Sequence, residues 1–279
     1  MRTIHVEEVA AKVESMLIDA CENIPENVLN CLRCAQKEEC SPLGQEVIKR
    51  IIDNDLLARE KHLPICQDTG VVVCFLEVGY DVHFDGDIYA AINEGVANAY
   101  TKGYLRKSVV KHPLDRVNTK NNTPAIVHVK FVPGDQVKID VAPKGGGSEN
   151  MSLVKMLIPA DGVEGVKKLV LDTVFNGGGK PCPPIIVGIG LGGNLEKSAM
   201  MAKESLMREI DDVNSDPILA KLEQELLEEI NALGVGPMGF GGTQTCLAVK
   251  VNAYPCHIAS LPVAINIQCH ASRHKSCVL

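Results

Sequence analysis

The fold is decided by a stretch that begins at residue 63 and reads Leu63-Pro64-Ile65-Cys66-Gln67-Asp68-Thr69-Gly70, followed by the apolar run Val71-Val72-Val73. The apolar run predicts a buried strand over 71–78, and Pro64 and Gly70 mark the loop before it. The thiol of Cys66, the amide of Gln67 and the carboxylate of Asp68 therefore lie together in the loop just before a strand. Binding residues concentrate on loops of this kind, which a rigid scaffold holds in place. The stretch predicts a ligand-binding loop, and the rest of the chain is expected to supply the walls and the remaining ligands.

The composition limits the classes of protein that the chain can belong to. With 279 residues, 46% hydrophobic and 23% charged, it can form one large domain or two modest ones. A net charge of −7 and the absence of tryptophan argue against nucleic-acid and anionic-membrane binding. No apolar run approaches the roughly 20 residues of a membrane span. Eleven cysteines without a secretory signal indicate a reducing compartment, so we expect a cytoplasmic protein.

Apolar residues at helical spacing predict a largely helical N-terminal segment of about 60 residues. It holds helices over 4–20 and 24–37, and a third that Ser41 caps and Pro42 opens. Further helices are expected over 87–101, 162–175, 194–210 and 216–233. Residues 103–123 are polar and basic, and they predict a long loop of the kind that is functional or disordered.

Alternating apolar residues predict strands over 125–132 and 136–141, and Pro133-Gly134-Asp135 between them predicts an antiparallel hairpin. Other strands are expected over 71–78, 185–189, 245–251 and 264–267. The order of elements is mixed. We therefore expect an α+β fold in which helices pack on mixed, partly antiparallel sheets, in a single compact domain.

Three cysteines share a position next to a predicted strand. Cys66 and Cys182 each precede one, and Cys269 follows one. Their separations of 116 and 87 residues exclude a local zinc knuckle or a ferredoxin-type run, whose cysteines lie a few residues apart. The three are either a cluster site that the fold assembles or buried, inert thiols.

Five motifs resemble those of the iron–sulfur class I fumarases, and they occur in that family's order between about residues 63 and 274. They are Cys66-Gln67-Asp68-Thr69-Gly70, Lys144-Gly145-Gly146-Gly147-Ser148-Glu149-Asn150, Cys182-Pro183-Pro184, Gly236-Pro237-Met238-Gly239-x-Gly241-Gly242, and the tail from His257 to Cys269. The chain is similar to the separate α subunit of two-subunit members, which include L-tartrate dehydratases. The resemblance implies that residues 1–279 form one α-subunit domain of an iron–sulfur hydro-lyase.

The resemblance also implies a cofactor and a set of site residues. A [4Fe-4S] cluster would be held by Cys66, Cys182 and Cys269, which leaves one iron open to bind a substrate hydroxyl as a Lewis acid. Asp68, assisted by His257, would deliver the proton to the departing hydroxyl. Substrate carboxylates would be held by Gln67, Arg106 and the backbone around Gly146 and Gly147.

The base that removes the carbon-bound proton lies, in single-chain members, in a C-terminal domain that this chain lacks. The resemblance therefore implies a separate β subunit that carries the base, in an α2β2 assembly or with the isolated subunit as a homodimer. The implied reaction is the interconversion of L-malate and fumarate. The alternative is dehydration of L-tartrate to oxaloacetate, and the α chain leaves that choice open.

Other interpretations stay open at this point. Asp68 could cap its own loop, and Arg106 and His257 could be a solvated charge and a structural histidine. Gly188-x-Gly190-x-x-Gly193 matches a dinucleotide-binding pattern, although we expect no βαβ unit around it. A non-enzymatic redox sensor would need no Asp68, Arg106 and His257 set. A zinc site at Cys31, Cys34 and Cys40 is a further alternative to incidental thiols.

Overall fold

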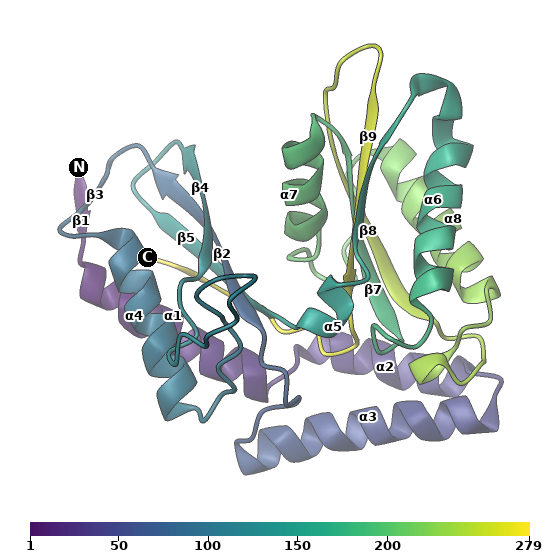
Figure 1. The fold of residues 1–279 in the computed structure, drawn as a ribbon, viewed down its shortest axis with the longest axis horizontal. Coiled ribbons are helices and arrows are strands. Elements are labelled where there is room, and N and C mark those ends of the chain that lie inside the picture. The colour runs from purple at the N-terminus through teal and green to yellow at the C-terminus, as the bar shows by residue number, and fades with distance from the viewer. The chain divides into compact units, whose positions relative to one another are not determined.

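The computed structural model describes residues 1–279, and the chain folds into two compact units (Figure 1). Unit 1 comprises residues 1–24, 55–146 and 273–279, and unit 2 comprises residues 25–54 and 147–272. No helix in the structure has both the length and the hydropathy of a membrane span. The predicted α+β class is confirmed, and so is the helical N-terminal segment, formed by α1 (Val6–Glu22), α2 (Glu26–Glu38) and α3 (Pro42–Lys61). That residues 1–279 act as one domain stays a prediction.

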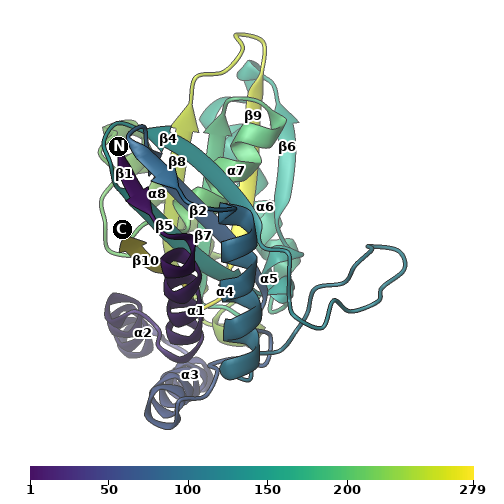
Figure 2. The same cartoon turned by 90° about the vertical axis from the view of Figure 1, so that its left-hand side faces the viewer.

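Unit 1 is built on a mixed four-stranded sheet in the order β10-β5-β2-β4. The strands are β2 (Val71–Gly79), β4 (Ile126–Val132), β5 (Val137–Lys144) and β10 (Lys275–Val278). Helices α1 and α4 (Ile88–Lys102) lie side by side against the sheet, and apolar side chains from both helices and from β2 and β5 form the core (Figures 1 and 2). Two short strands, β1 (Arg2–Ile4) and β3 (Val82–Phe84), pair in parallel.

The predicted hairpin of β4 and β5 is wrong. Both strands form where the alternation places them, but β2 lies between them, parallel to β4 and antiparallel to β5. The turn at 133–136 instead crosses the end of β2, where Gly79 donates to the carbonyl of Gln136 and Asp81 to that of Gly134. Alternation determines which face of a strand is buried, but it does not determine which strand lies beside it.

Unit 2 has a second mixed sheet, in the order β6-β9-β7-β8. Its strands are β6 (Leu153–Leu157), β7 (Ile185–Gly192), β8 (Cys246–Tyr254) and β9 (Leu261–Gln268). Helix α7 (Leu195–Ser205) covers one face, and α6 (Gly162–Gly177) and α8 (Pro217–Ala232) cover the other (Figure 1). A one-turn helix, α5 (Gly146–Glu149), precedes β6. The sheet is thus a buried platform whose two ends carry the loops.

The glycine pattern at 188–193 serves helix packing. Strands β7 and β8 are parallel neighbours connected through α7 and α8, so the expectation that no βαβ unit surrounds the pattern is wrong. A Cβ on Gly188 would lie 2.2 Å from the carbonyl oxygen of Ala202, and one on Gly190 would lie 2.0 Å from that of Ser198. Both glycines therefore let α7 approach β7 closely. Gly193 donates its N–H to Tyr254, so this amide is occupied within the fold.

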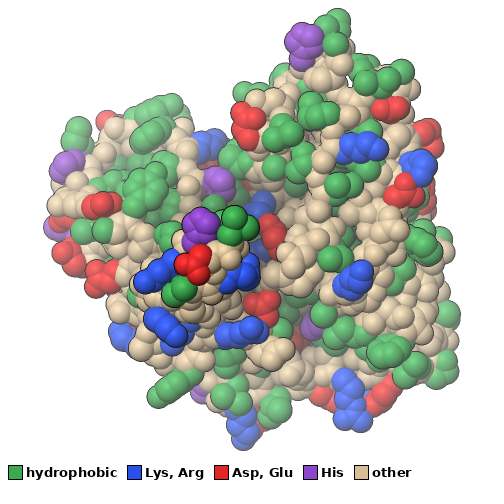
Figure 3. Space-filling model, viewed as in Figure 1, with side chains coloured by type: hydrophobic (Ala, Val, Ile, Leu, Met, Phe, Trp, Pro, Cys, Tyr) green, Lys and Arg blue, Asp and Glu red, His purple; other side chains and the backbone are tan.

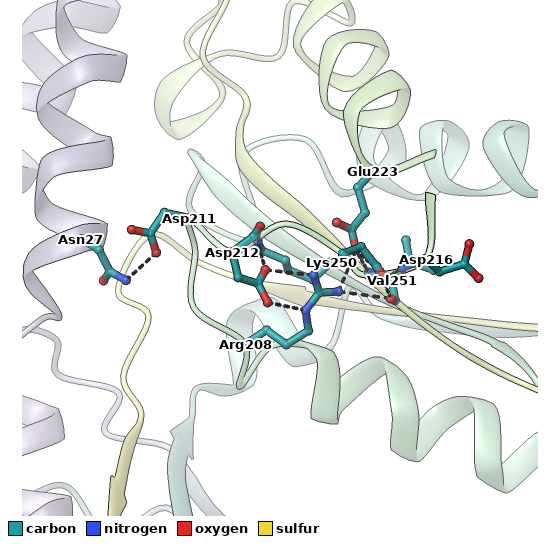
Figure 4. A network of polar contacts seen from close by, with 9 residues as sticks. Asn27, Arg208, Asp211, Asp212, Asp216, Glu223, Lys250 and Val251 are labelled. Carbon is teal, nitrogen blue, oxygen red and sulfur yellow. Dashed lines mark hydrogen bonds and ion pairs between the residues drawn. The ribbon is translucent and has the colours of Figure 1, made fainter. Parts of the chain in front are cut away.

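A partly buried ion network fixes the segment after α7 to β8 (Figure 4). Arg208 donates to Asp212 at 2.8 Å and to Glu223 at 2.7 Å, and Lys250 pairs with Asp212. Two cations face two carboxylates, so the charges balance within the network. Such a satisfied network is structural, because every buried charge already has its partner.

Candidate active site

The loop that carries Cys66, Gln67 and Asp68 lies in unit 1 directly before β2, and buried polar groups hold its backbone. The Tyr100 hydroxyl donates to the carbonyls of Thr69 at 2.5 Å and Gly70 at 3.0 Å. The Asn122 amide donates to Gly70 at 3.1 Å. Neither Tyr100 nor Asn122 is exposed to solvent, so each must satisfy its polar group inside the protein. The loop is therefore a preorganised part of the fold.

Asp68 accepts two backbone hydrogen bonds, one at each carboxylate oxygen. Oδ1 accepts from Gly70 at 3.1 Å, which is the capping role that the sequence left open. Oδ2 accepts from Gly146 at 2.8 Å, which joins the first motif to the glycine-rich second motif. The structure thus brings together two of the predicted site residues, Asp68 and Gly146. Each oxygen still has acceptor capacity for a further partner.

Arg106 and Gln67 are exposed at the same loop. The Thr69 hydroxyl donates to the carbonyl of Arg106 at 3.0 Å, so the backbone of Arg106 is attached to the Cys66 loop. The side chains of Arg106 and Gln67 are exposed, and neither forms a hydrogen bond or an ion pair within the structure. Both remain available to an incoming carboxylate.

Arg106 begins an arm at residues 104–122 that projects from unit 1 between α4 and β4 (Figure 2). The arm holds five of the chain's 28 basic residues but only one of its 35 acidic residues. Basic side chains gather around the arm in Figure 3. A basic surface on an acidic chain attracts anionic ligands to this place.

Cys182 and Cys269 lie together at one end of the sheet in unit 2. Strands β7 and β9 are antiparallel with Ile186 opposite Gln268, so the residues just before β7 meet those just after β9. The amide of His270 donates to the carbonyl of Cys182 at 3.5 Å. Neither cysteine is in a disulfide, and both are partly exposed. Cys182 also has a φ of 58°, a conformation that is costly outside glycine and is concentrated at functional sites.

The glycine-rich stretch from Gly236 to Gly242 supports the Cys182 loop. The amide of Met238 donates to the carbonyl of Pro183 at 2.8 Å. Beyond this stretch, the amides of Thr243 and Gln244 donate to the carboxylate of Glu39, which is 2% exposed. Burial raises the pKa of Glu39, but these backbone hydrogen bonds outweigh it and lower the pKa. Sequence reasoning missed Glu39 because Thr243 and Gln244 lie 204 and 205 residues further along the chain.

The second motif ends in a polar network around Glu149. Lys203 of α7 pairs with Glu149 at 2.6 Å, and Asn266 of β9 donates to it at 2.9 Å. Asn266 also donates to the Ser152 hydroxyl at 3.0 Å. Glu149 therefore fixes α5 against the sheet of unit 2, and it has a structural role in this motif.

His257 lies away from the two thiols of unit 2. It is exposed on the turn between β8 and β9, whereas Cys269 follows the other end of β9 (Figure 1). Its Nδ1 accepts from the amide of Ala259 at 3.1 Å, and its ring borders an apolar cavity of about 440 Å³. The structure does not bring His257 to Cys182 and Cys269 within unit 2.

The candidate residues are divided between the two units. Unit 1 contains Cys66, Gln67, Asp68, Arg106 and Gly146, and unit 2 contains Gly147, Cys182, His257 and Cys269. No group of three or more histidine, cysteine or acidic side chains in the structure is arranged to hold a metal ion, and this includes the thiols of Cys31, Cys34 and Cys40. The three cysteines are therefore divided, with Cys66 in unit 1 and with Cys182 and Cys269 in unit 2.

Comparison with known proteins identifies relatives over nearly the whole chain. A family model described as Fumarate hydratase (Fumerase) matches residues 10–278. A protein of Methanocaldococcus jannaschii, provisionally named L(+)-tartrate dehydratase subunit alpha, is 45% identical over 268 residues, which cover 94% of each chain. A protein of Escherichia coli named L(+)-tartrate dehydratase subunit alpha is 30% identical over 270 residues, which cover 95% of this chain and 88% of the relative. These similarities span both units.

Proposed function

Because the chain belongs to the fumarate hydratase (Fumerase) family, we propose that it is the α subunit of an iron–sulfur hydro-lyase that reversibly dehydrates a hydroxy-dicarboxylic acid. The observation that carries the proposal is the preorganised loop before β2. It places a free thiol beside a carboxylate that two backbone N–H groups hold in place. An enzyme that eliminates water needs such a fixed carboxyl group to protonate the departing hydroxyl.

The proposed cofactor is a [4Fe-4S] cluster with one iron that the protein does not ligate. Its ligands would be Cys66, Cys182 and Cys269. The donor chemistry fits, because all three are partly exposed cysteines outside any disulfide and thiolates are the usual ligands of such clusters. Two of them meet at one end of the β7–β9 pair. When bound, the cluster would supply a Lewis acid for the substrate hydroxyl.

The covalent chain supports bringing the third thiol to the other two. Gly146 donates to Asp68, and the next residue, Gly147, belongs to unit 2. Arg273 donates to the carbonyl of Asp68, and Cys269 lies only four residues earlier in the chain. Four residues span at most about 14 Å, so the chain itself limits how far Cys269 can lie from Arg273.

The proposed substrate-binding and acid roles are assigned to side chains that can reach a bound substrate. Arg106 has an exposed guanidinium that can pair bidentately with one substrate carboxylate, and Gln67 can donate to another oxygen. The amide of Gly146 donates to the Asp68 carboxylate, and the backbone at Gly146 and at the next residue, Gly147, is proposed to add anion contacts. Asp68 is the proposed proton donor. The assistance of His257 stays a prediction, which a His257→Ala variant would test.

The substrate that we propose first is L-malate, in equilibrium with fumarate. L-tartrate is the second candidate, because the relatives from M. jannaschii and E. coli carry names of L(+)-tartrate dehydratase subunits. Both acids place a hydroxyl next to a carboxylate, so the same loop would serve either. The extra hydroxyl of tartrate would need an additional polar partner.

We further propose that the chain works with a β subunit that supplies the base, in an α2β2 assembly in the cytoplasm, and that the isolated α subunit is a homodimer. The support is that the relatives are themselves named as subunits. The chain alone would then hold the cluster but turn over substrate poorly.

The test is anaerobic co-expression with the neighbouring reading frame, followed by assays on L-malate, fumarate and L-tartrate. We expect a brown protein that dehydrates at least one acid, and an Asp68→Asn variant that keeps its iron but loses turnover. Colourless protein without turnover on any of the three would refute the proposal. A requirement for nicotinamide would favour the dehydrogenase alternative instead.

A further inference from the structure

Arg273 is a buried cation in unit 1 to which the proposed chemistry assigns no role. It follows the segment that carries Cys269 and precedes β10, and it is only 4% exposed. Arginine is seldom buried without a carboxylate partner, because desolvating the guanidinium is costly. The burial of Arg273 therefore needs a reason, which is to be found in the groups that its guanidinium binds.

The guanidinium of Arg273 contacts the backbone of the candidate proton donor. Nη1 donates to the carbonyl of Asp68 at 2.7 Å. Nη2 lies 3.3 Å from the position that a Cβ on Gly145 would take, and Oδ2 of Asp68 lies 3.2 Å from that same position. Arg273 thus binds the backbone of Asp68, and its guanidinium and the Asp68 carboxylate both lie beside Gly145. Any side chain at residue 145 would press against both groups.

Arg273 forms no ion pair, although the Asp68 carboxylate lies near its guanidinium. Its other polar contact is the side chain of Cys21, and its Nε is buried without a partner. This differs from Arg208, which is partly buried and forms ion pairs with two carboxylates. A buried positive charge at the loop favours an anion bound there.

Building on the proposed function, we infer that Arg273 is a positioning residue for Asp68. It fixes the Asp68 backbone so that the carboxylate keeps its N–H partners on Gly70 and Gly146, and its charge offsets that of an anionic substrate at the loop. It touches no substrate itself, because its atoms are buried. The effect of losing Arg273 should therefore reach the substrate only through the loop.

The test compares Arg273→Gln, which removes the charge, with Arg273→Lys, which keeps it. Arg208→Gln serves as the control for loss of a partly buried, ion-paired arginine in unit 2. Hydrogen–deuterium exchange of the full chain reports on the amides of Gly70 and Gly146, and kcat and KM are measured with the β subunit present. Loss of a hydrogen bond from a charged donor corresponds to about a 10- to 100-fold effect.

We expect Arg273→Gln to speed exchange at both amides by about tenfold or more and to lower kcat by a similar factor, with iron content retained. Arg273→Lys should recover part of both effects and keep KM nearly unchanged, and it provides the measurement if the glutamine variant does not fold. The control should lose stability while both amides stay protected. Unchanged exchange and turnover in Arg273→Gln would overturn the inference. If wild type dehydrates none of the acids but the exchange effect is seen, the proposed function fails and the positioning role stands.

Discussion

Glu39→Gln is the substitution whose effect the structure defines most closely. Each oxygen of this buried carboxylate accepts two backbone hydrogen bonds. Oε1 accepts from Ser41 at 2.8 Å and Thr243 at 3.0 Å, and Oε2 accepts from Thr243 at 2.9 Å and Gln244 at 2.7 Å. A glutamine replaces one acceptor by a donor, so at least one of these amides loses its partner in either orientation of the side chain.

The magnitude follows from counting those bonds. A hydrogen bond to a charged group contributes about 1.5–3 kcal/mol, and the remaining bonds weaken when the charge is removed. We therefore expect the free energy of unfolding to fall by about 3 kcal/mol, which for a unit of this size lowers Tm by about 6–12 °C. Circular dichroism during heating and in urea measures both quantities.

The same substitution predicts a pH dependence with a definite sign. The pKa of Glu39 is lowered from its ordinary value of 4.5, so its stabilising contribution is complete above that pH and is lost as the pH falls through the folded-state pKa. Glutamine does not titrate there. The difference in stability between wild type and variant should be constant from pH 7 down to about 4.5 and should shrink below it.

A matched control is Glu46→Gln on α3, where the carboxylate is exposed and pairs only with Arg50. Its effect should stay within about 0.5 kcal/mol. Glu39 supports the stretch that holds the Cys182 loop, so Glu39→Gln should also speed alkylation of Cys182. The reasoning is refuted if the two glutamine variants unfold at the same temperature.

Three further predictions concern the site and its platform. The proposed cluster ligands are Cys66, Cys182 and Cys269, and replacing any one of them by serine should abolish iron binding, as measured by iron analysis. Serine at the exposed Cys34 should leave the iron content unchanged. Alanine at Arg106 should raise KM for the dicarboxylate by about 10- to 100-fold with the cluster retained, and alanine at Arg116 on the same arm should change it little. Alanine at Gly190 should destabilise unit 2 by about 1–3 kcal/mol in thermal unfolding, because its Cβ would meet the carbonyl of Ser198; an unchanged Tm would contradict the packing argument.

The helices and strands of this protein can be predicted from local sequence, but which strands lie side by side in a sheet cannot. Helical spacing and the cap at Ser41 locate α1 to α3 to within a few residues, because amphipathic helices form in response to residues nearby in the chain. The alternation over 126–132 likewise predicts β4. It does not predict that β2 separates β4 from β5, because the choice of partner depends on long-range packing.

The candidate site divides in the same way. The order of the motifs and the chemistry of the residue types made Cys66, Asp68, Cys182 and Cys269 candidates, and their roles stay a prediction. Only the folded chain showed that Gly146 binds the Asp68 carboxylate and that Arg273 and Glu39 are buried supports. A charged residue in a sequence is expected at the surface, and burial becomes visible only when distant backbone amides and carbonyls surround it. The residue types were therefore determined by the sequence, and the partners that hold them were decided by the tertiary structure.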